Sequence, residues 1–72
     1  MEKRSFKLSG HYTSVALEPD FWAVLDAVAD VRELSMAALV DQVDAERETT
    51  NLASALRCFA LEQALNATPI DE

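Results

Sequence analysis

The sequence has few of the residues that cross-link very small proteins. Among its 72 residues there is one cysteine, Cys58, and one histidine, His11. A single cysteine excludes an internal disulfide, and a single histidine argues against a structural zinc site. Because a chain this short usually needs a cross-link or a second subunit for stability, oligomerisation is expected. Cys58, which precedes Phe59, is expected to behave as an inert small hydrophobic residue.

Positive charge is also scarce, and half of it lies near the N-terminus. Six Lys and Arg residues oppose thirteen Asp and Glu residues, which gives a net charge of −7. Residues 1–14 carry three cations and one acid, whereas residues 15–72 carry three cations and twelve acids. Proteins that bind nucleic acid through charge are normally basic, so any DNA contact is expected at the N-terminal end.

Long apolar runs are absent as well. No segment approaches the roughly 20 apolar residues of a membrane span, and residues 1–10 lack the apolar run of a signal peptide. Half of the residues are nevertheless hydrophobic, which favours a folded globular domain over a disordered chain. We therefore expect a single domain that is cytoplasmic and makes no membrane contact.

The segment "HYTSVALEPDFW", residues 11–22, predicts a β-strand that leads directly into a helix. Val15 and Leu17 alternate with polar or small residues and should face the core. A lone strand needs a partner for its backbone groups. Residues 6–8 also alternate, and Ser9-Gly10 separates them from the strand. Two interpretations remain open: a hairpin within the chain, or a bend at Gly10 in an N-terminal arm.

Three helices are expected after the strand. The first begins at "EPDF", with Glu18 as cap and Pro19 in the first turn, and runs to about Val31. The second begins at the N-cap Ser35. "RETTN", residues 47–51, interrupts the apolar pattern, and a third helix should end near Ala67. Residues 68–72 are expected to form a frayed tail. The apolar stripes predicted for the three helices are Phe21, Val24, Leu25 and Val28; Met36, Leu39, Val40 and Val43; and Leu52, Leu56, Phe59 and Ala60, widened by Leu61 and Leu65.

The run "TSVALEPDFWAVLDAVADVRELSMAALVDQV" resembles the ribbon-helix-helix family of small bacterial DNA-binding proteins. The junction "LEP-x-FW" and the later segment "NLASALRCFALE" resemble a subgroup of that family with a third helix. The resemblance covers about residues 5–66. It implies a mainly α fold with one N-terminal β-strand, in which two copies pair their strands into an antiparallel ribbon as an intertwined homodimer.

This resemblance sets the expected organisation of the chain. Residues 1–10 would form a basic arm, 11–48 the ribbon-helix-helix core, 49–67 the additional helix and 68–72 the tail. The partner strand would come from the second copy. The residues expected in the dimer core are Val15, Leu17, Phe21, Trp22, Leu25, Val28, Leu39, Val40 and Val43.

The resemblance also implies a function, that of a transcriptional repressor binding double-stranded DNA as a dimer or tetramer. Its ribbon would enter the major groove and contact base edges through Tyr12, Ser14 and Ala16. Phosphate contacts are expected at the start of the second helix and along the arm, from Ser35, Met36, Ala37, Lys3, Arg4, Lys7 and His11. The sequence departs from the family here, because Tyr12, Ser14 and Ala16 replace the usual Arg, Lys, Asn, Gln or Thr.

The alternative is an interaction or oligomerisation module that keeps the fold and binds a protein partner, as antitoxins do. The acidic helices and the third helix favour this alternative. No set of nucleophile, base and orienting group can be assembled, so we do not expect an enzyme. We also expect no cofactor and no metal site, because the acids of residues 41–48 lie along a solvated helix face.

Overall fold

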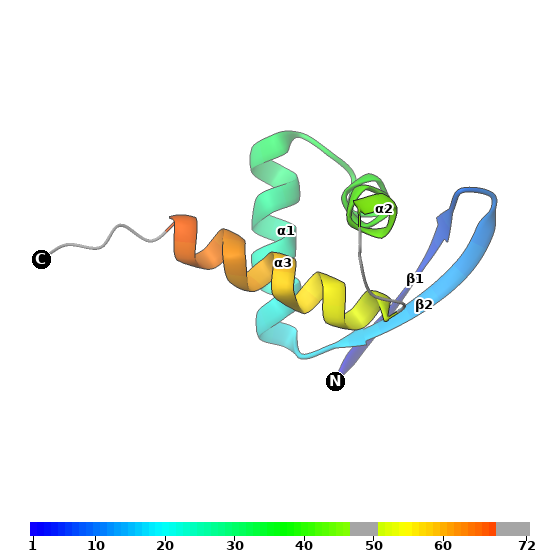
Figure 1. The fold of residues 1–72 in the computed structure, drawn as a ribbon, viewed down its shortest axis with the longest axis horizontal. Coiled ribbons are helices and arrows are strands. Elements are labelled where there is room, and N and C mark those ends of the chain that lie inside the picture. Colours follow the sequence, from blue (N-terminus) through cyan, green and yellow to red (C-terminus); the bar gives the residue numbers. More distant parts are fainter. Residues whose placement is uncertain (47–50, 68–72) are drawn as a thin grey trace, which may run out of the picture.

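The protein is described by a computed structural model that covers residues 1–46 and 51–67. Two strands, β1 (Glu2–Leu8) and β2 (His11–Leu17), precede three helices, α1 (Pro19–Arg32), α2 (Met36–Glu46) and α3 (Leu52–Ala67). The strands form a curved ribbon on one side of the helices, and α3 crosses α1 (Figure 1). Within the described ranges, no helix is long and apolar enough to cross a membrane.

The ribbon is a hairpin made by one chain. β1 and β2 pair antiparallel over their full length, from Glu2 opposite Leu17 to Leu8 opposite His11. Ser9 and Gly10 form the loop with φ of 49° and 87°, the positive values that a two-residue type I′ turn requires. Of the two interpretations that the sequence left open, the structure therefore has the hairpin. The expected two-stranded antiparallel ribbon is present, and within this chain it pairs β1 with β2. The pairing expected between two copies stays a prediction.

The helix ends follow the capping residues predicted from the sequence. Pro19 occupies the first turn of α1, and the backbone N–H of Phe21 donates to the Glu18 carbonyl at 3.0 Å. At α2, the Ala38 N–H donates to the Ser35 side-chain oxygen at 3.1 Å, which confirms Ser35 as the N-cap. The side-chain oxygen of Asn51 likewise accepts from Ser54 at the start of α3. The predictions for residues 47–50 and 68–72 fall outside the described residues.

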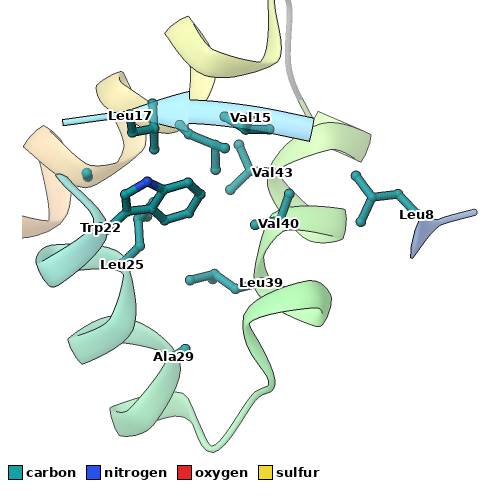
Figure 2. Close-up of a cluster of buried hydrophobic side chains, with 11 residues drawn as sticks. Leu8, Val15, Leu17, Trp22, Leu25, Ala29, Leu39, Val40 and Val43 are labelled. Atoms are coloured by element: carbon teal, nitrogen blue, oxygen red, sulfur yellow. The ribbon is translucent and has the colours of Figure 1, made fainter. Parts of the chain in front are cut away.

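The core lies between the inner face of the ribbon and the three helices (Figure 2). Its largest fully buried side chain is Trp22, with 1% of its surface exposed. The residues expected to form a dimer core lie in this intrachain core or pack against it. Buried members are Val15, Leu17, Trp22, Leu25, Leu39, Val40 and Val43, and partly buried members are Phe21 and Val28. Leu8, Ala29, Leu56 and Ala60 complete the core. Leu61 and Leu65, expected to widen the stripe of α3, are instead exposed.

Candidate nucleic-acid interface

The outer face of the ribbon, which points away from the helices, carries side chains from both strands. Strand alternation and the observed register place three cross-strand pairs on this face. The pairs are Lys3 with Ala16, Ser5 with Ser14, and Lys7 with Tyr12. Tyr12, Ser14 and Ala16 were predicted from the sequence to share the solvent face of their strand. The structure adds the side chains of β1 to that face.

The outer face holds two cations and hydrogen-bonding groups, with no acid among its six side chains. The Ser5 and Ser14 hydroxyls are 2.9 Å apart and hydrogen-bonded. The Lys7 ammonium lies 5.7 Å from the centre of the Tyr12 ring, within cation–π range. Tyr12 is 78% exposed, so neither the ring nor its hydroxyl is covered by a helix. The face therefore offers donors, a π surface and one methyl group, that of Ala16, to a ligand.

Arg4 lies on the opposite, inner face of β1. Its guanidinium donates two hydrogen bonds to the Asp26 carboxylate, at 3.0 and 3.2 Å, and one to Glu2 at 2.7 Å. It also lies 4.6 Å above the centre of the Trp22 ring. The hydrogen bonds to Asp26 and then Glu2 raise the pKa of Arg4 above its usual value. Arg4 is thus bonded within the fold, and its side chain is not on the outer face, where the other DNA contacts are expected.

The other basic residue predicted near the DNA, His11, pairs with Leu8 at the turn end of the ribbon. It lines a pocket of about 550 Å³ between β2 and the start of α3, together with Thr13, Asp44 and Asn51. Alternation places it on the inner side of β2 and not beside Tyr12. His11 is exposed, but the structure does not bring it into the outer face.

The N-terminus of α2, where Ser35, Met36 and Ala37 lie, is not next to β2. Along α2, Val43 lies near Val15 of β2, whereas the Leu39 end of the helix is farther away (Figure 2). The first N–H groups of a helix have no partner within it and suit an anion. The phosphate contact predicted at this helix end stays a prediction.

An ion pair fixes the strand-to-helix junction next to the ribbon. Arg57 of α3 donates to the two carboxylate oxygens of Glu18, at 2.9 and 3.4 Å, and its guanidinium lies 5.9 Å from the Phe21 ring. Hydrogen bonding from Arg57, followed by the backbone N–H of Glu18 itself, lowers the pKa of the Glu18 carboxyl. The negative charge of Glu18, between β2 and α1, is thus paired with the positive charge of Arg57 on α3.

A family comparison agrees with this architecture. The family model described as "Ribbon-helix-helix domain" matches residues 1–64. The chain belongs to the ribbon-helix-helix family. Ribbon-helix-helix domains generally form dimers and act as DNA-binding regulators or antitoxins, and they are typically regulatory and not enzymatic. Searches among curated proteins and among solved structures gave no significant match.

The sequence analysis did not name Ser5 as a residue of the outer face of the ribbon. The pattern that could have identified it is the alternation of "SFKL", in which Phe6 and Leu8 lie on one side and Lys7 on the other. That alternation placed Lys7 correctly opposite the apolar residues. Only the pairing register shows that Lys3, Ser5 and Lys7 stand beside Tyr12, Ser14 and Ala16.

Cys58, expected to be an inert small hydrophobic residue, is exposed on α3.

Proposed function

We propose that this ribbon-helix-helix protein is a sequence-specific DNA-binding regulator that represses transcription as a dimer on a palindromic operator. The outer face of the ribbon would enter the major groove, whose width admits a two-stranded β-ribbon. The observation that carries the proposal is the composition of that face, on which Lys3 and Lys7 are exposed and none of the six side chains is acidic. The acidic remainder of the chain would then orient the protein by pointing its helices away from the phosphates.

The charge distribution explains how a protein with a net charge of −7 could bind DNA. Exposed charges separated by more than about 10 Å are largely screened at 0.1 M salt, so the local charge of the ribbon outweighs that of distant helices. Glu18, which follows β2, is paired with Arg57, and Asp26 of α1 is paired with Arg4. Their paired charges oppose an approaching phosphate less than free carboxylates would.

The proposal is tested by titrating labelled duplexes from the protein's own promoter region at 50 and 200 mM salt and following fluorescence anisotropy. Binding that weakens steeply with salt indicates counterion release from phosphates and supports the proposal. Absence of binding at low salt contradicts it. Sedimentation with and without DNA gives the number of chains in the complex.

A second candidate function, a protein-interaction module, is favoured by one apolar groove. This groove of about 340 Å³ lies between α1 and α3 and is lined by Val24, Ala27, Val28, Val31, Arg32, Gln63 and Ala64. Val31 is 82% exposed, and Leu65 is 65% exposed on α3. Exposed apolar surface of this kind often marks an interface. A dimer that ignores DNA at low salt would favour this second function.

A further inference from the structure

We propose that β1 is a phosphate-contacting strand. It would lie beside a central ribbon, made by β2 and the β2 strand of a second copy, and its Lys3 and Lys7 would contact the DNA backbone at the rims of the major groove. The proposal rests on the function proposed above and on the strand pairing expected between two copies. It goes beyond both by assigning different roles to the two strands of the outer face: β2 contacts bases, and β1 contacts phosphates.

β2 has a free edge on which a second strand can pair. In the described part of the chain the sheet consists of β1 and β2 alone, so each strand has one unpaired edge. Leu8 and His11 close the two-residue turn, and from there an antiparallel ladder directs the backbone groups of alternate residues outward. On β2 these outward groups are the N–H and C=O of Tyr12, Ser14 and Ala16. The free edge of β2 therefore offers the donors and acceptors that a further strand needs.

The pocket of about 550 Å³ between β2 and α3 lies along this free edge. Residues 13–16 of β2 all line it, although neighbouring side chains of a strand point to opposite faces. A pocket can touch both kinds of side chain only from the edge of the strand. Its other wall is the start of α3, with Leu52 and Ala53 (Figure 1). The helices thus leave space beside β2 for a strand of a second copy.

The free edge of β1 suits a partner strand less well, because β1 carries charged side chains. Pairing two copies of β1 about a two-fold axis at its middle residue would place Lys3 opposite the partner's Lys7, and like charges in opposite positions destabilise a sheet. Lysines on an edge strand commonly prevent such pairing. Pairing two copies of β2 in the same way places Tyr12 opposite the partner's Ala16, with no charge at either position. β2 is therefore the central strand, and β1 is the outer one.

β1 stays attached to its own chain in this arrangement. At one end, the Trp22 indole N–H donates to the Glu2 carbonyl at 2.7 Å. In the middle, the Arg4 guanidinium donates to the Asp26 carboxylate at 3.0 Å, and at the turn end Leu8 is 1% exposed in the core. These contacts leave the free edge of β2 open. A dimer paired through β2 therefore keeps two outer strands, each held by the core of its own chain.

The width of such a sheet places β1 at the phosphates. Neighbouring strands are about 4.8 Å apart, so the two β2 strands fit within a major groove that is about 12 Å wide. The axes of the two outer strands would be about 14 Å apart, which is more than the width of the groove. β1 therefore lies at the rims of the groove, beside the sugar-phosphate backbone, while the central ribbon faces the base edges.

The side chains of β1 suit this position. Its outer face presents Lys3, Ser5 and Lys7, all exposed, and lysine and serine are common donors to phosphate oxygens. Glu2, the one acid of β1, accepts a hydrogen bond from Arg4 at 2.7 Å, so its charge is compensated within the chain. The outer side chains of β2 are an uncharged phenol, a hydroxyl and a methyl group, which can touch base edges and do not attract a phosphate.

The first test is the salt dependence of binding. The probe is a set of duplexes selected by wild-type protein from a pool with a randomised core, titrated by fluorescence anisotropy between about 50 and 200 mM salt. A dimer carries each lysine twice, and each phosphate contact contributes about 0.9 to the slope of log K against log salt, so Lys3→Gln and Lys7→Gln should each lower the slope by about 2. The control Arg32→Gln removes the same charge from the end of α1 and should leave the slope unchanged. Circular dichroism confirms that each variant is folded.

The second measurement separates phosphate contacts from base contacts. The two lysine variants are titrated against a selected duplex and against duplexes in which single base pairs are changed. Phosphate contacts carry no sequence information, so the ratio of affinities for any two duplexes should stay within about fivefold of the wild-type ratio. Loss of a base contact would instead change the ratio at one position by more than about fivefold.

A lowered slope with unchanged affinity ratios is the result we expect from both lysine variants. An unchanged slope overturns the inference, and so does a change in base preference of more than about fivefold in either variant. Both of these results leave the proposed function standing, because wild-type protein still selects and binds a duplex. If wild-type protein selects no duplex, the proposed function fails, and this inference fails with it.

Discussion

The indole N–H of Trp22 donates a hydrogen bond to the backbone carbonyl of Glu2, at 2.7 Å, across twenty residues of sequence. This bond joins the first turn of α1 to the open end of the hairpin. The Trp22 ring is fully buried under Arg4 and Phe6. One side chain thus links the core to the strand that carries Lys3 and Lys7.

Replacing Trp22 should strongly destabilise the protein. Trp22→Ala is expected to lower the free energy of unfolding by about 3–5 kcal/mol, because a large buried aromatic side chain leaves a cavity. The control Trp22→Phe retains a buried ring and loses the hydrogen bond to Glu2, so its cost should be smaller. Urea unfolding followed by circular dichroism measures both variants. An unchanged midpoint in Trp22→Ala would show that this residue does not support the core.

Arg4 and Lys7 should have opposite roles although both are basic residues of β1. Arg4→Met is expected to lower stability by about 1 kcal/mol, since it removes a partly exposed ion pair and a cation–π contact. Lys7→Met should leave stability nearly unchanged and weaken DNA binding. Parallel urea and anisotropy measurements separate the two effects. Equal stability losses in both variants would contradict the assignment of faces.

The hairpin turn offers a stabilising substitution. Ser9 has a φ of 49°, a region that costs an ordinary residue roughly 1–2 kcal/mol and that asparagine adopts more readily. Ser9→Asn should recover part of this cost, since Asn-Gly is favoured in type I′ turns and the amide can still donate to Asp41. Thermal unfolding should show a higher midpoint. If the strands paired between copies without this turn, the substitution would have no stabilising effect.

Acid should weaken the link between α1 and α3. Hydrogen bonding from Arg57 lowers the pKa of Glu18 below 4.5, so the unfolded chain binds a proton more readily at this residue. The stability gained from the pair is present above the ordinary pKa and is lost as pH falls through the lowered value. Titration of Glu18 by NMR in wild-type protein and in Arg57→Met should show the pKa return toward 4.5. No difference between the two proteins would contradict the pairing.

Local features of the fold were predictable from the sequence. Ser35 and Pro19 act within one helical turn, so capping identified both helix starts, and alternation placed Tyr12, Ser14 and Ala16 on one face. Leu61 and Leu65 match a helical stripe, but the neighbouring helices do not reach them. Periodicity shows which residues share a face and not whether another element covers it.

The pairing of β2 could not be decided from the sequence. Its alternation is the same whether the partner strand is residues 2–8 or a second copy. Ser9 at positive φ also weakens the turn signal, because Ser-Gly is less typical of such turns than Asn-Gly. Long-range contacts within the chain hold β1 beside β2, chiefly Arg4 with Asp26 and Trp22 with Glu2. The sequence shows Lys3, Arg4 and Lys7 only as three basic residues, and it takes these contacts to show that Arg4 lies on the other face of β1.

The central claim, that the outer face of the ribbon binds DNA, is tested most directly by a pair of charge-matched variants. Lys3→Gln with Lys7→Gln removes two positive charges from that face, and Arg32→Gln with Arg57→Gln removes two from the helices. Anisotropy titrations with the same selected duplexes compare them at one salt concentration, after circular dichroism confirms folding. We predict that the lysine variant loses about tenfold or more in affinity, because a dimer loses a charged contact to DNA at each lysine, and that the arginine variant binds nearly as wild type. Equal affinities in the two variants would contradict the claim.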